Sequence, residues 1–308
     1  MADPAPVVAL FGATALGKSD VALELAERLD AEIVVADSMQ VYAGLPIVTN
    51  QPGAEARRRA TYHLVAWLAP QDECSVAEYA SAAHDVVDGL LAAGRRVIVE
   101  GGSGLYLRAV LGDLTFGGAP GEGRRALEER WGRDPGGLVA ELERRAPDVA
   151  ARIDTRNGRR VIRALESLDA SRGEARHDAL WQPAERYEHR LFALLPDGDR
   201  VALNARIDRR VDDMLDAGAL EEVAAARAPG PFSRTAAQAI GVRELCAVLD
   251  GELSLEEAAA RMKTRTRALA RRQLTWMRKL PEAALVPAAE RPPEQVAAAV
   301  LALLPRGA

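Results

Sequence analysis

The sequence predicts an α/β protein: a doubly wound parallel sheet that carries an inserted all-helical domain and a helical C-terminal part. Short apolar runs alternate with helical patterns over the first 116 of the 308 residues, which is typical of parallel strands joined by helices. From residue 117 to about 189 the chain is rich in Ala, Arg and Glu at helical spacing and has no strand signal. Another apolar run follows that segment, so we interpret the helical part as an insertion.

Apolar periodicity and the residues that end each run define the elements of the first part. Helices are expected from about residue 17 or 18 to 29 and from 75 to 92, and the second begins with a capping box of Ser75 and Glu78. The expected strands are mostly apolar, as strands buried on both faces of a parallel sheet are. The expected strands are Val7–Phe11, Ala31–Ala36 and the run in RRVIVEGGSG.

Glycines and a returning apolar run delimit the insertion. The stretch FGGAPGEG reads as a hinge, and HRLFALLP reads as a strand that brings the chain back to the sheet. We therefore assign residues 1–116 and 190–308 to the core domain and residues 117–189 to the inserted helical domain.

The C-terminal part is predicted to be helical. Helices are expected over 199–217 and 254–279, and the second is capped by Ser254 and Glu257. After Pro281 the chain is rich in Ala and Pro, and we expect a short closing helix there.

Composition limits the possible function classes. The chain has a net charge of −5, two cysteines and four histidines. No apolar run approaches the roughly 20 residues of a membrane-spanning helix, and the N-terminus lacks the pattern of a secretory signal. Cys74 and Cys246 lie far apart and the histidines are scattered, which indicates neither a disulfide framework nor a zinc site. We expect a cytoplasmic protein with no membrane partner.

The stretch GATALGKS matches the phosphate-binding pattern G-x-x-x-x-G-K-[ST] in full, between an expected strand and an expected helix. Backbone N–H groups and the helix N-terminus form an anion site in such a loop. Lys18 is expected to reach the outer phosphate and Ser19 to ligate Mg²⁺. The pattern predicts a nucleotide-binding, P-loop NTPase-like fold, with a glycine-rich turn of no function as the alternative. The loop comprises Gly12, Ala13, Thr14, Ala15, Leu16, Gly17, Lys18 and Ser19.

Acidic residues end two other expected strands. Asp37 follows IVVA, and Glu100 ends VIVE. Ligands bind at the carboxyl ends of the strands in sheets of this kind, so Gly12, Asp37 and Gly101 are expected to meet in one crevice. Glu100 is also in the position where an ATPase or GTPase would hold Mg²⁺, which leaves that class of enzyme open.

Several blocks resemble the bacterial tRNA dimethylallyltransferases of the IPP transferase family. The stretch DSMQVYAGLPIVTNQP is similar to that family's D-S-x-Q-x-Y-x-G-x-x-I-x-T-x-x-P segment. Five further stretches resemble family blocks in the same order, and the resemblance runs from Gly12 to Arg278. They are YHLVAWLAPQDECSVAEYASAA, GGSGLYLRAV, NGRRVIRALE, AQAIGVRELCAVLDGELSLEEA and TRALARRQLTWMRK.

The chain departs from the family pattern at a few positions. Leu16 stands where the family usually has Ser, and Ser19 replaces Thr but keeps the hydroxyl. Asn50-Gln51 replaces the usual Ala-Lys, and Val242 replaces Tyr. None of these changes removes a group assigned to catalysis, although Leu16 and Gln51 affect details of the phosphate site.

The resemblance implies a prenyl transfer in which the diphosphate is a leaving group. Dimethylallyl diphosphate would give its dimethylallyl group to N6 of the adenosine 3′ of the anticodon, position 37, in tRNAs that read UNN codons. The products would be N6-isopentenyladenosine and diphosphate, with Mg²⁺ as cofactor. The family also suggests a monomer.

The resemblance implies catalytic roles for Asp37, Lys18, Arg206 and Arg210. An adenine N6 amine is a poor nucleophile and needs a base, and the family's motif Asp falls on Asp37. The alternative is that Asp37 only orders the loop that follows. Lys18 and the two arginines would stabilise charge on the leaving diphosphate; for the arginines, a solvated helix face is the alternative.

The tRNA is expected to contact the core domain, the insertion and the last long helix. Ser38 and Gln40 are placed to read the edge of a flipped adenine. Residues 261–279 hold eight Lys or Arg and no acid, which favours contact with a phosphate backbone over a merely solvated face. Within this basic run we expect Lys263, Arg267, Arg271 and Trp276 to contact the tRNA. The other expected tRNA contacts lie in the stretches that resemble the family: Asp37, Ser38, Met39, Gln40, Ser103, Arg124, Arg159, Arg160, Val161, Ile162, Arg163, Gln238, Gly241 and Arg243.

Three other functions remain possible on the sequence alone. A small-metabolite kinase would use the same loop with ATP and would not need the basic helix. A non-catalytic RNA-binding or nucleotide-binding protein would bind tRNA without forming a product. An isopentenyltransferase acting on free AMP or ADP would also not need a basic helix of this length.

Overall fold

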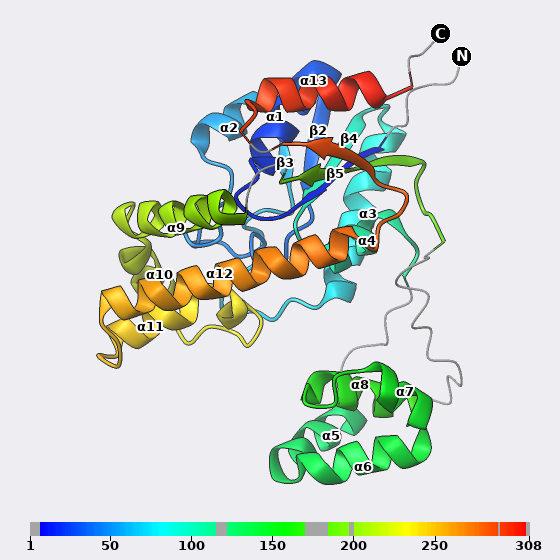
Figure 1. Cartoon of the computed structure of the whole chain (residues 1–308), viewed down its shortest axis with the longest axis vertical. Helices are drawn as coiled ribbons and strands as arrows, with labels where there is room; N and C mark the ends of the chain where they lie inside the picture. The colour runs from blue at the N-terminus through cyan, green and yellow to red at the C-terminus, as the bar shows by residue number, and fades with distance from the viewer. Residues whose placement is uncertain (1–6, 115–121, 170–183, 197–199, 289, 306–308) are drawn as a thin grey trace. The chain divides into compact units, whose positions relative to one another are not determined.

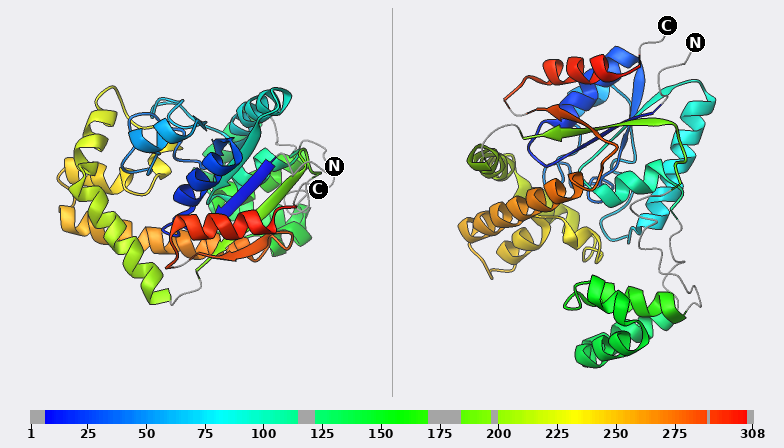
Figure 2. Two further views of the ribbon diagram at one scale, coloured as in Figure 1. Left: turned by 90° about the horizontal axis from the view of Figure 1, so that it is seen from above. Right: turned by 45° about the vertical axis from the view of Figure 1, so that its right-hand side comes forward.

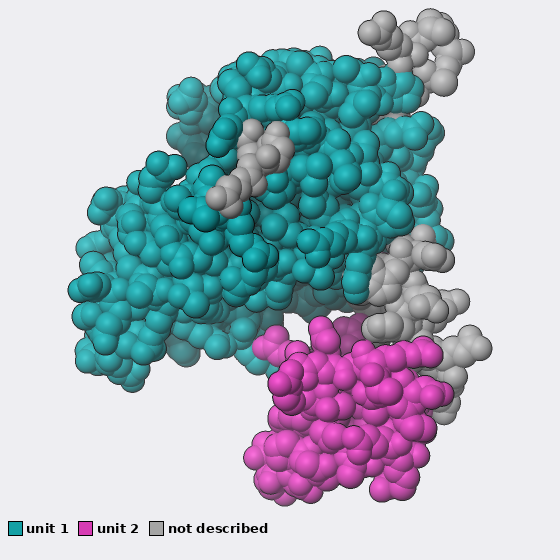
Figure 3. Space-filling view, in the orientation of Figure 1, with its two compact units in different colours: residues 1–113, 183–308 teal, residues 114–182 magenta. Residues whose placement is uncertain are grey.

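The computed structural model describes residues 7–114, 122–169, 184–196, 200–288 and 290–305. The chain forms two compact units (Figure 3): unit 1 comprises Met1–Asp113 and Pro183–Ala308, and unit 2 comprises Leu114–Gln182. Each unit has hydrophobic side chains buried in a core of its own.

A six-stranded sheet organises unit 1. Its order is β3-β2-β4-β1-β5-β6, and each pair of neighbours is parallel. The strands are β1 (Val7–Gly12), β2 (Ala31–Val35), β3 (Tyr62–His63), β4 (Arg96–Gly101), β5 (His189–Leu195) and β6 (Ala284–Pro287).

Helices cover both faces of this sheet (Figure 1 and Figure 2). The helices α3 and α12 begin at the predicted capping boxes, with Ser75 Oγ accepting from Glu78 N at 3.1 Å and Ser254 Oγ from Glu257 N at 3.1 Å. The helices of unit 1 are α1 (Lys18–Leu29), α2 (Ala54–Arg59), α3 (Val76–Ala92), α4 (Gly104–Leu111), α9 (Arg200–Asp216), α10 (Ala219–Arg227), α11 (Val242–Leu249), α12 (Leu255–Met277) and α13 (Pro293–Leu303), with a 3-10 turn η2 (Ala236–Gln238).

Alternating side chains of the strands feed two cores. Val97 and Val99 of β4 belong to the core shared with α3 and α4, whereas Ile98 between them belongs to the core shared with α1 and α13. Successive side chains of a strand point to opposite faces, so continuously apolar strands are buried on both.

Unit 2 is all-helical. Its helices are α5 (Glu122–Arg133), α6 (Pro135–Arg145), α7 (Pro147–Arg152) and α8 (Gly158–Asp169). Apolar side chains of α5, α6 and α8 form the core, among them Leu138, Leu142, Val161 and Leu165, each at most 1% exposed. A strip of this kind on each helix is sufficient to bury a small core between them.

The predicted fold class is confirmed: the sheet is parallel and doubly wound, and helices make up the C-terminal part. The sequence did not reveal β3 and β6, because β3 has only two residues and β6 only four, shorter than the runs that periodicity detects. Unit 2 ends at Gln182, before the predicted border at 189. The difference arises because Asp113 N donates to Ala184 O and Arg186 N to Leu111 O, each at 3.0 Å, which attaches this segment to unit 1.

No helix among the described residues combines the length and the hydropathy that crossing a membrane requires.

Candidate active site

The loop between β1 and α1 has the backbone shape of an anion site. Gly17, the N-cap of α1, has φ 73°, and no side chain caps the helix. No capping side chain therefore bonds to the N–H groups of the first turn of α1, and these groups remain available to bind an anion. Ala15 also has a positive φ of 64°, an uncommon conformation for a residue with a Cβ.

Glu100 lies beneath this loop and is 2% exposed. Its Oε1 accepts a hydrogen bond of 3.1 Å from Ser19 Oγ, and its Oε2 lies 3.9 Å from Lys18 Nζ. Burial raises the pKa of Glu100, while Lys18 and Ser19 act in the opposite direction. The three groups link the start of α1 to the end of β4.

The carboxyl ends of β2, β4 and β1 meet next to the loop because these strands are neighbours in the sheet. Ala36 N donates to Glu100 O at 2.7 Å, and a side chain at Gly101 would overlap the Ala36 carbonyl. Glycine at this position therefore lets the two strand ends approach. The predicted convergence of Gly12, Asp37 and Gly101 at one edge of the sheet follows from this strand order.

Asp37 comes two residues after the end of β2. Its Oδ1 accepts from Met39 N at 2.8 Å and from Gln40 N at 3.4 Å. Oδ2 has no hydrogen-bond partner among the described residues. Asp37 therefore orders the loop that follows with one oxygen, and its second oxygen is left for a ligand.

Arg210 of α9 interacts electrostatically with Asp37, Asp20 and Glu100. Burial lowers the pKa of Arg210, and the three carboxylates oppose this effect. Arg206 lies one turn earlier on the same helix, and neither arginine is ion-paired within the described part of the chain. Arg210 is thus a partly buried cation, without an ion pair in the described residues, that interacts electrostatically with the carboxylates at this end of the sheet.

Polar side chains line the loop after β2 and the start of α4. Gln40 is 8% exposed, and its Oε1 has no hydrogen-bond partner among the described residues. Ser38 is partly exposed beside it. Ser103 is the N-cap of α4 but makes no side-chain capping bond. A buried amide oxygen without a partner is costly, which indicates a ligand that supplies a donor.

Tyr79 and Tyr106 pack behind this edge, with ring centroids 4.6 Å apart. The Tyr79 hydroxyl donates to Val35 O at 2.7 Å, which fixes the ring under the end of β2. Both tyrosines interact electrostatically with Asp37.

Some of the basic side chains of α12 are paired with carboxylates of α9. Lys263 Nζ lies 2.6 Å from Asp212 Oδ1, and Arg267 Nε donates to Asp208 Oδ1 at 2.9 Å, so two predicted tRNA contacts are neutralised by α9. Arg271 is exposed. Trp276 packs against Gly104, where a side chain on the glycine would overlap the indole.

The predicted tRNA contacts before α12 lie around η2 and the start of α11. Gln238 Nε2 donates to Arg234 O at 3.1 Å, and Gln238 O accepts from Arg265 Nη2 at 3.3 Å. Gly241 has φ 107°, which permits the turn into α11, and Arg243 is exposed.

The remaining predicted contacts belong to unit 2. Arg124 lies 3.3 Å from Glu128 and 3.6 Å from Glu166, whereas Arg159, Arg160 and Arg163 are exposed. Val161 and Ile162, 0% and 4% exposed, are part of the core of unit 2. Their side chains therefore support α8 and do not form part of its surface.

Gln273 of α12, which sequence reasoning did not single out, reaches the loop. Its Oε1 accepts a hydrogen bond of 2.9 Å from Thr14 N. The signal in the sequence was its place in TRALARRQLTWMRK, one of the stretches that resemble the family; its burial, at 7% exposed, is visible only in the structure.

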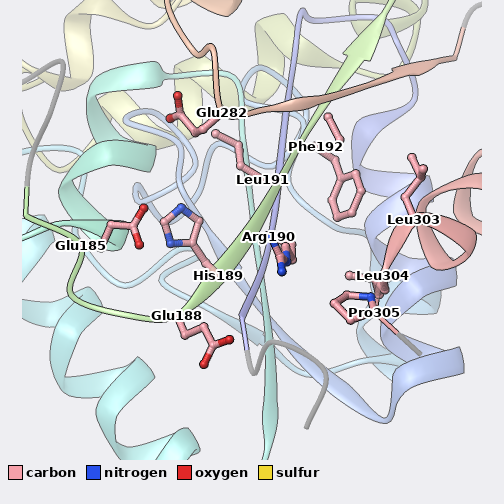
Figure 4. A pocket seen from close by; sticks show the side chains of 11 residues that line it. Glu185, Glu188, His189, Arg190, Leu191, Phe192, Glu282, Leu303, Leu304 and Pro305 are labelled. Atoms are coloured by element: carbon pink, nitrogen blue, oxygen red, sulfur yellow. The ribbon is translucent and has the colours of Figure 1, made fainter. Parts of the chain in front are cut away.

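A separate cavity of about 580 Å³ lies at the opposite ends of the strands (Figure 4). It is lined by the start of β5, including His189 and Arg190, and by Glu282 and the end of α13, including Leu303 and Leu304. The loop, Asp37 and Glu100 are at the carboxyl ends, so this cavity is not part of the same site.

No group of three or more His, Cys, Asp or Glu side chains in the described part of the chain is arranged to hold a metal ion. Ser19 Oγ and the Glu100 carboxylate supply two adjacent oxygen atoms. Mg²⁺ uses few protein ligands and completes its shell with water and phosphate oxygens, so this donor pair fits such a cation.

Comparison with known proteins places the chain among the relatives of one enzyme family. The family model described as IPP transferase matches residues 40–280. The chain is 42% identical over 279 residues to the tRNA dimethylallyltransferase of Nocardioides sp., covering 90% of this chain and 89% of that one. It is 40% identical to the enzyme of the same name from Streptomyces avermitilis over 91% and 90% of the two chains.

Solved structures that resemble this one come from the same group of enzymes. The tRNA isopentenylpyrophosphate transferase of Bacillus halodurans superposes with a TM-score of 0.70 and 31% identity over 96% of this chain and 95% of that one. A eukaryotic dimethylallyltransferase described as acting on tRNA gives a TM-score of 0.75 and 25% identity over 92% and 74% of the two chains. With a family model that matches most of its length and relatives of this similarity, the chain belongs to the IPP transferase family.

Proposed function

We propose that this protein is a tRNA dimethylallyltransferase. It transfers the dimethylallyl group of dimethylallyl diphosphate to N6 of adenosine 37, 3′ of the anticodon, in tRNAs that read UNN codons. The observation that carries the proposal is that Lys18, Ser19 and the buried Glu100 meet at the loop of residues 12–19 (the anion loop), which leads into the N-terminus of α1. Asp37 follows β2 at the same ends of the strands, and Arg210 interacts electrostatically with Asp37 and Glu100. A base and a diphosphate site at one edge of the sheet are what this reaction needs.

Asp37 acts as the general base. N6 attacks C1 of the dimethylallyl group, the C1–O bond breaks, and the electron pair leaves with the diphosphate. Oδ2 of Asp37 takes the N6 proton, while Oδ1 stays bonded to Met39 N and Gln40 N. A positioned base typically contributes ~10²–10⁴-fold to such a step.

The loop and three cations hold the diphosphate. The N–H groups of α1 and the Lys18 ammonium take the charge that develops on the leaving oxygens. Arg210 and Arg206 approach from α9, and Arg210 is the one that is supported by its electrostatic contact with the carboxylates of this site. Desolvation of Arg210 strengthens its interaction with an anion.

Mg²⁺ would be held by Ser19 Oγ, with Glu100 as an adjacent oxygen donor. When bound, the cation would neutralise part of the charge on the diphosphate. The buried Glu100 also keeps Ser19 and Lys18 oriented toward the loop.

Gln40 reads the adenine. Its unpartnered Oε1 can accept from a base amino group while its amide N–H₂ donates, and Ser38 and Ser103 add hydroxyls nearby. Extrusion of the base from the anticodon loop brings it to this edge. Arg271 and Arg243, both exposed, together with Arg159, Arg160 and Arg163 of unit 2, bind backbone phosphates.

The protein works as a cytoplasmic monomer in this proposal. Its substrate RNA is cytoplasmic, and both cysteines are free thiols, as expected in a reducing compartment. One chain carries every residue assigned above.

The test is a transfer assay. Protein, Mg²⁺, an unmodified anticodon stem-loop with A37 and radiolabelled dimethylallyl diphosphate are incubated, with Asp37→Ala in parallel. Label in the RNA that falls by about 10²-fold or more in the variant supports the proposal. Label on free AMP but not on RNA, or phosphoryl transfer from ATP to a small acceptor, would replace it with one of the other two enzymes.

A further inference from the structure

Helix α12 touches the anion loop at one buried polar side chain. Gln273 is 7% exposed, whereas the preceding Arg271 and Arg272 and the following Thr275 are exposed. A buried amide in the last turns of a basic helix requires partners for its polar atoms. Those partners lie in the loops after β1 and β4.

The two ends of the Gln273 amide face different loops. Oε1 accepts from Thr14 N at 2.9 Å, inside the anion loop. Nε2 lies against Gly102, where an added Cβ would overlap it. One side chain therefore fixes the loop that follows β1 and abuts the loop that follows β4, the two loops that frame the diphosphate position.

The anion loop needs such support. Ala15, next to Thr14, has φ 64°, which is sparsely populated by residues that carry a Cβ. A conformation of this kind persists only where the surroundings hold it. The bond from Thr14 to Gln273 is a long-range contact that does so, since it joins residues 259 positions apart.

The same helix is attached to α9. Lys263 pairs with Asp212 and Arg267 with Asp208, and α9 carries Arg206 and Arg210. A displacement of α12 would therefore move the loop and the arginines together.

We propose that Gln273 is a positioning residue for the diphosphate site: through the Thr14 amide it sets the anion loop in its binding conformation and makes that conformation depend on the position of α12. The inference rests on the proposed function, because the ligand of the loop is taken to be dimethylallyl diphosphate. Gln273 acts through the loop and does not touch the reacting atoms.

The first experiment compares Gln273→Met with the wild type. Methionine keeps the length and the helix propensity but cannot accept the Thr14 N–H. We expect KM for dimethylallyl diphosphate to rise about tenfold or more, as for a misplaced binding group, with the Kd for the stem-loop RNA and the melting temperature unchanged. Thr275→Val, an exposed neighbour on the same helix turn, is the control and should leave both constants unchanged.

A second variant disturbs the same amide from the opposite side. Gly102→Ala places a Cβ against Nε2 of Gln273. Like Gln273→Met, it should raise KM for dimethylallyl diphosphate. In the Gln273→Met background the same change should have a smaller effect, because the two substitutions act on one contact. Independent, multiplicative effects would contradict the coupling.

Three outcomes overturn the inference. They are an unchanged KM in Gln273→Met, a loss confined to kcat, and equal losses in RNA affinity, KM and melting temperature. Each presupposes that the wild type transfers the prenyl group to RNA; if it does not, the proposed function fails first. A titration with inorganic diphosphate gives a separate readout, and its Kd should rise in Gln273→Met.

Discussion

Asp37 and Met39 are joined by a hydrogen bond of 2.8 Å from the Met39 N–H to Oδ1 of Asp37. The bond makes an Asx-type turn directly after β2, so the carboxylate is both part of the backbone architecture and the candidate base. The two roles use different oxygens and can be separated by substitution.

Asp37→Asn should abolish catalysis without disturbing the turn. Asparagine keeps an Oδ1 that accepts from Met39 N, but it has no basic oxygen to take the N6 proton. We expect kcat to fall by about 10²-fold or more, with the melting temperature close to that of the wild type. Asp37→Ala should lose the same activity and in addition about 1 kcal/mol of stability from the missing turn bonds. Single-turnover rates and thermal melts measure both; Asp37→Asn with wild-type kcat would remove Asp37 from the chemistry.

Arg210→Gln should weaken diphosphate binding more than Arg206→Gln. Arg210 is the arginine that interacts electrostatically with Asp37, Asp20 and Glu100, the carboxylates at this end of the sheet. A hydrogen bond to a charged partner contributes about 1.5–3 kcal/mol, which corresponds to a ~10- to 150-fold rise in Kd for diphosphate. Calorimetric titration with inorganic diphosphate measures the Kd of each variant. Equal effects of the two substitutions would indicate that the arginines share the ligand.

Glu222→Gln should change how stability depends on pH. The Glu222 carboxylate accepts from Ile47 N at 2.7 Å and from Val48 N at 2.9 Å. Burial nevertheless raises its pKa above the ordinary value of 4.5, because desolvation outweighs the two backbone bonds.

With a raised pKa, the folded state holds the Glu222 proton to a higher pH than the unfolded chain does. This contribution to stability is complete below the unfolded value and is lost as pH rises through the folded pKa. As the pH rises above the ordinary value of 4.5, the wild type should therefore lose stability relative to Glu222→Gln. Chemical unfolding at a series of pH values checks this; a difference between the two proteins that does not vary with pH, or varies in the opposite direction, would contradict it.

Arg271→Ala should reduce tRNA affinity more than Lys263→Ala. Arg271 is exposed, whereas Lys263 is paired with Asp212 at 2.6 Å and contributes little free positive charge. Each lost phosphate contact should lower the slope of log K against log salt by about 0.7–0.9. Filter binding over a salt series distinguishes the two variants. An equal change in slope would show that the Lys263 pair opens when RNA binds.

The sequence was informative wherever a structural rule is local. The strand, loop and helix of GATALGKS, and the capping boxes at Ser75 and Ser254, are specified by residues within a few positions of each other. Periodicity likewise predicted the long helices and the parallel sheet. It missed β3 and β6, since strands of two and four residues carry too few side chains to show a period.

Residue type alone was less informative about surfaces. The tRNA contacts of Lys263 and Arg267 stay a prediction, but the sequence did not show that both side chains pair with carboxylates of α9, some 50 to 60 positions earlier in the chain. Val161 and Ile162 were included with their arginine neighbours, yet they form part of a core. A charge or a motif position does not show which way a side chain points.

The sequence by itself determined the fold class, the anion loop and the family, because each depends on short-range patterns or on blocks read in order. Only the tertiary structure decided which groups meet: Glu100 with Lys18 and Ser19, and Gln273 with Thr14. It also brought Arg210 into electrostatic interaction with Asp37. These contacts join residues that are 81 to 259 positions apart for the hydrogen bonds. Their formation depends on strand order and helix packing, which bury polar atoms against distant partners and are not encoded in any single stretch.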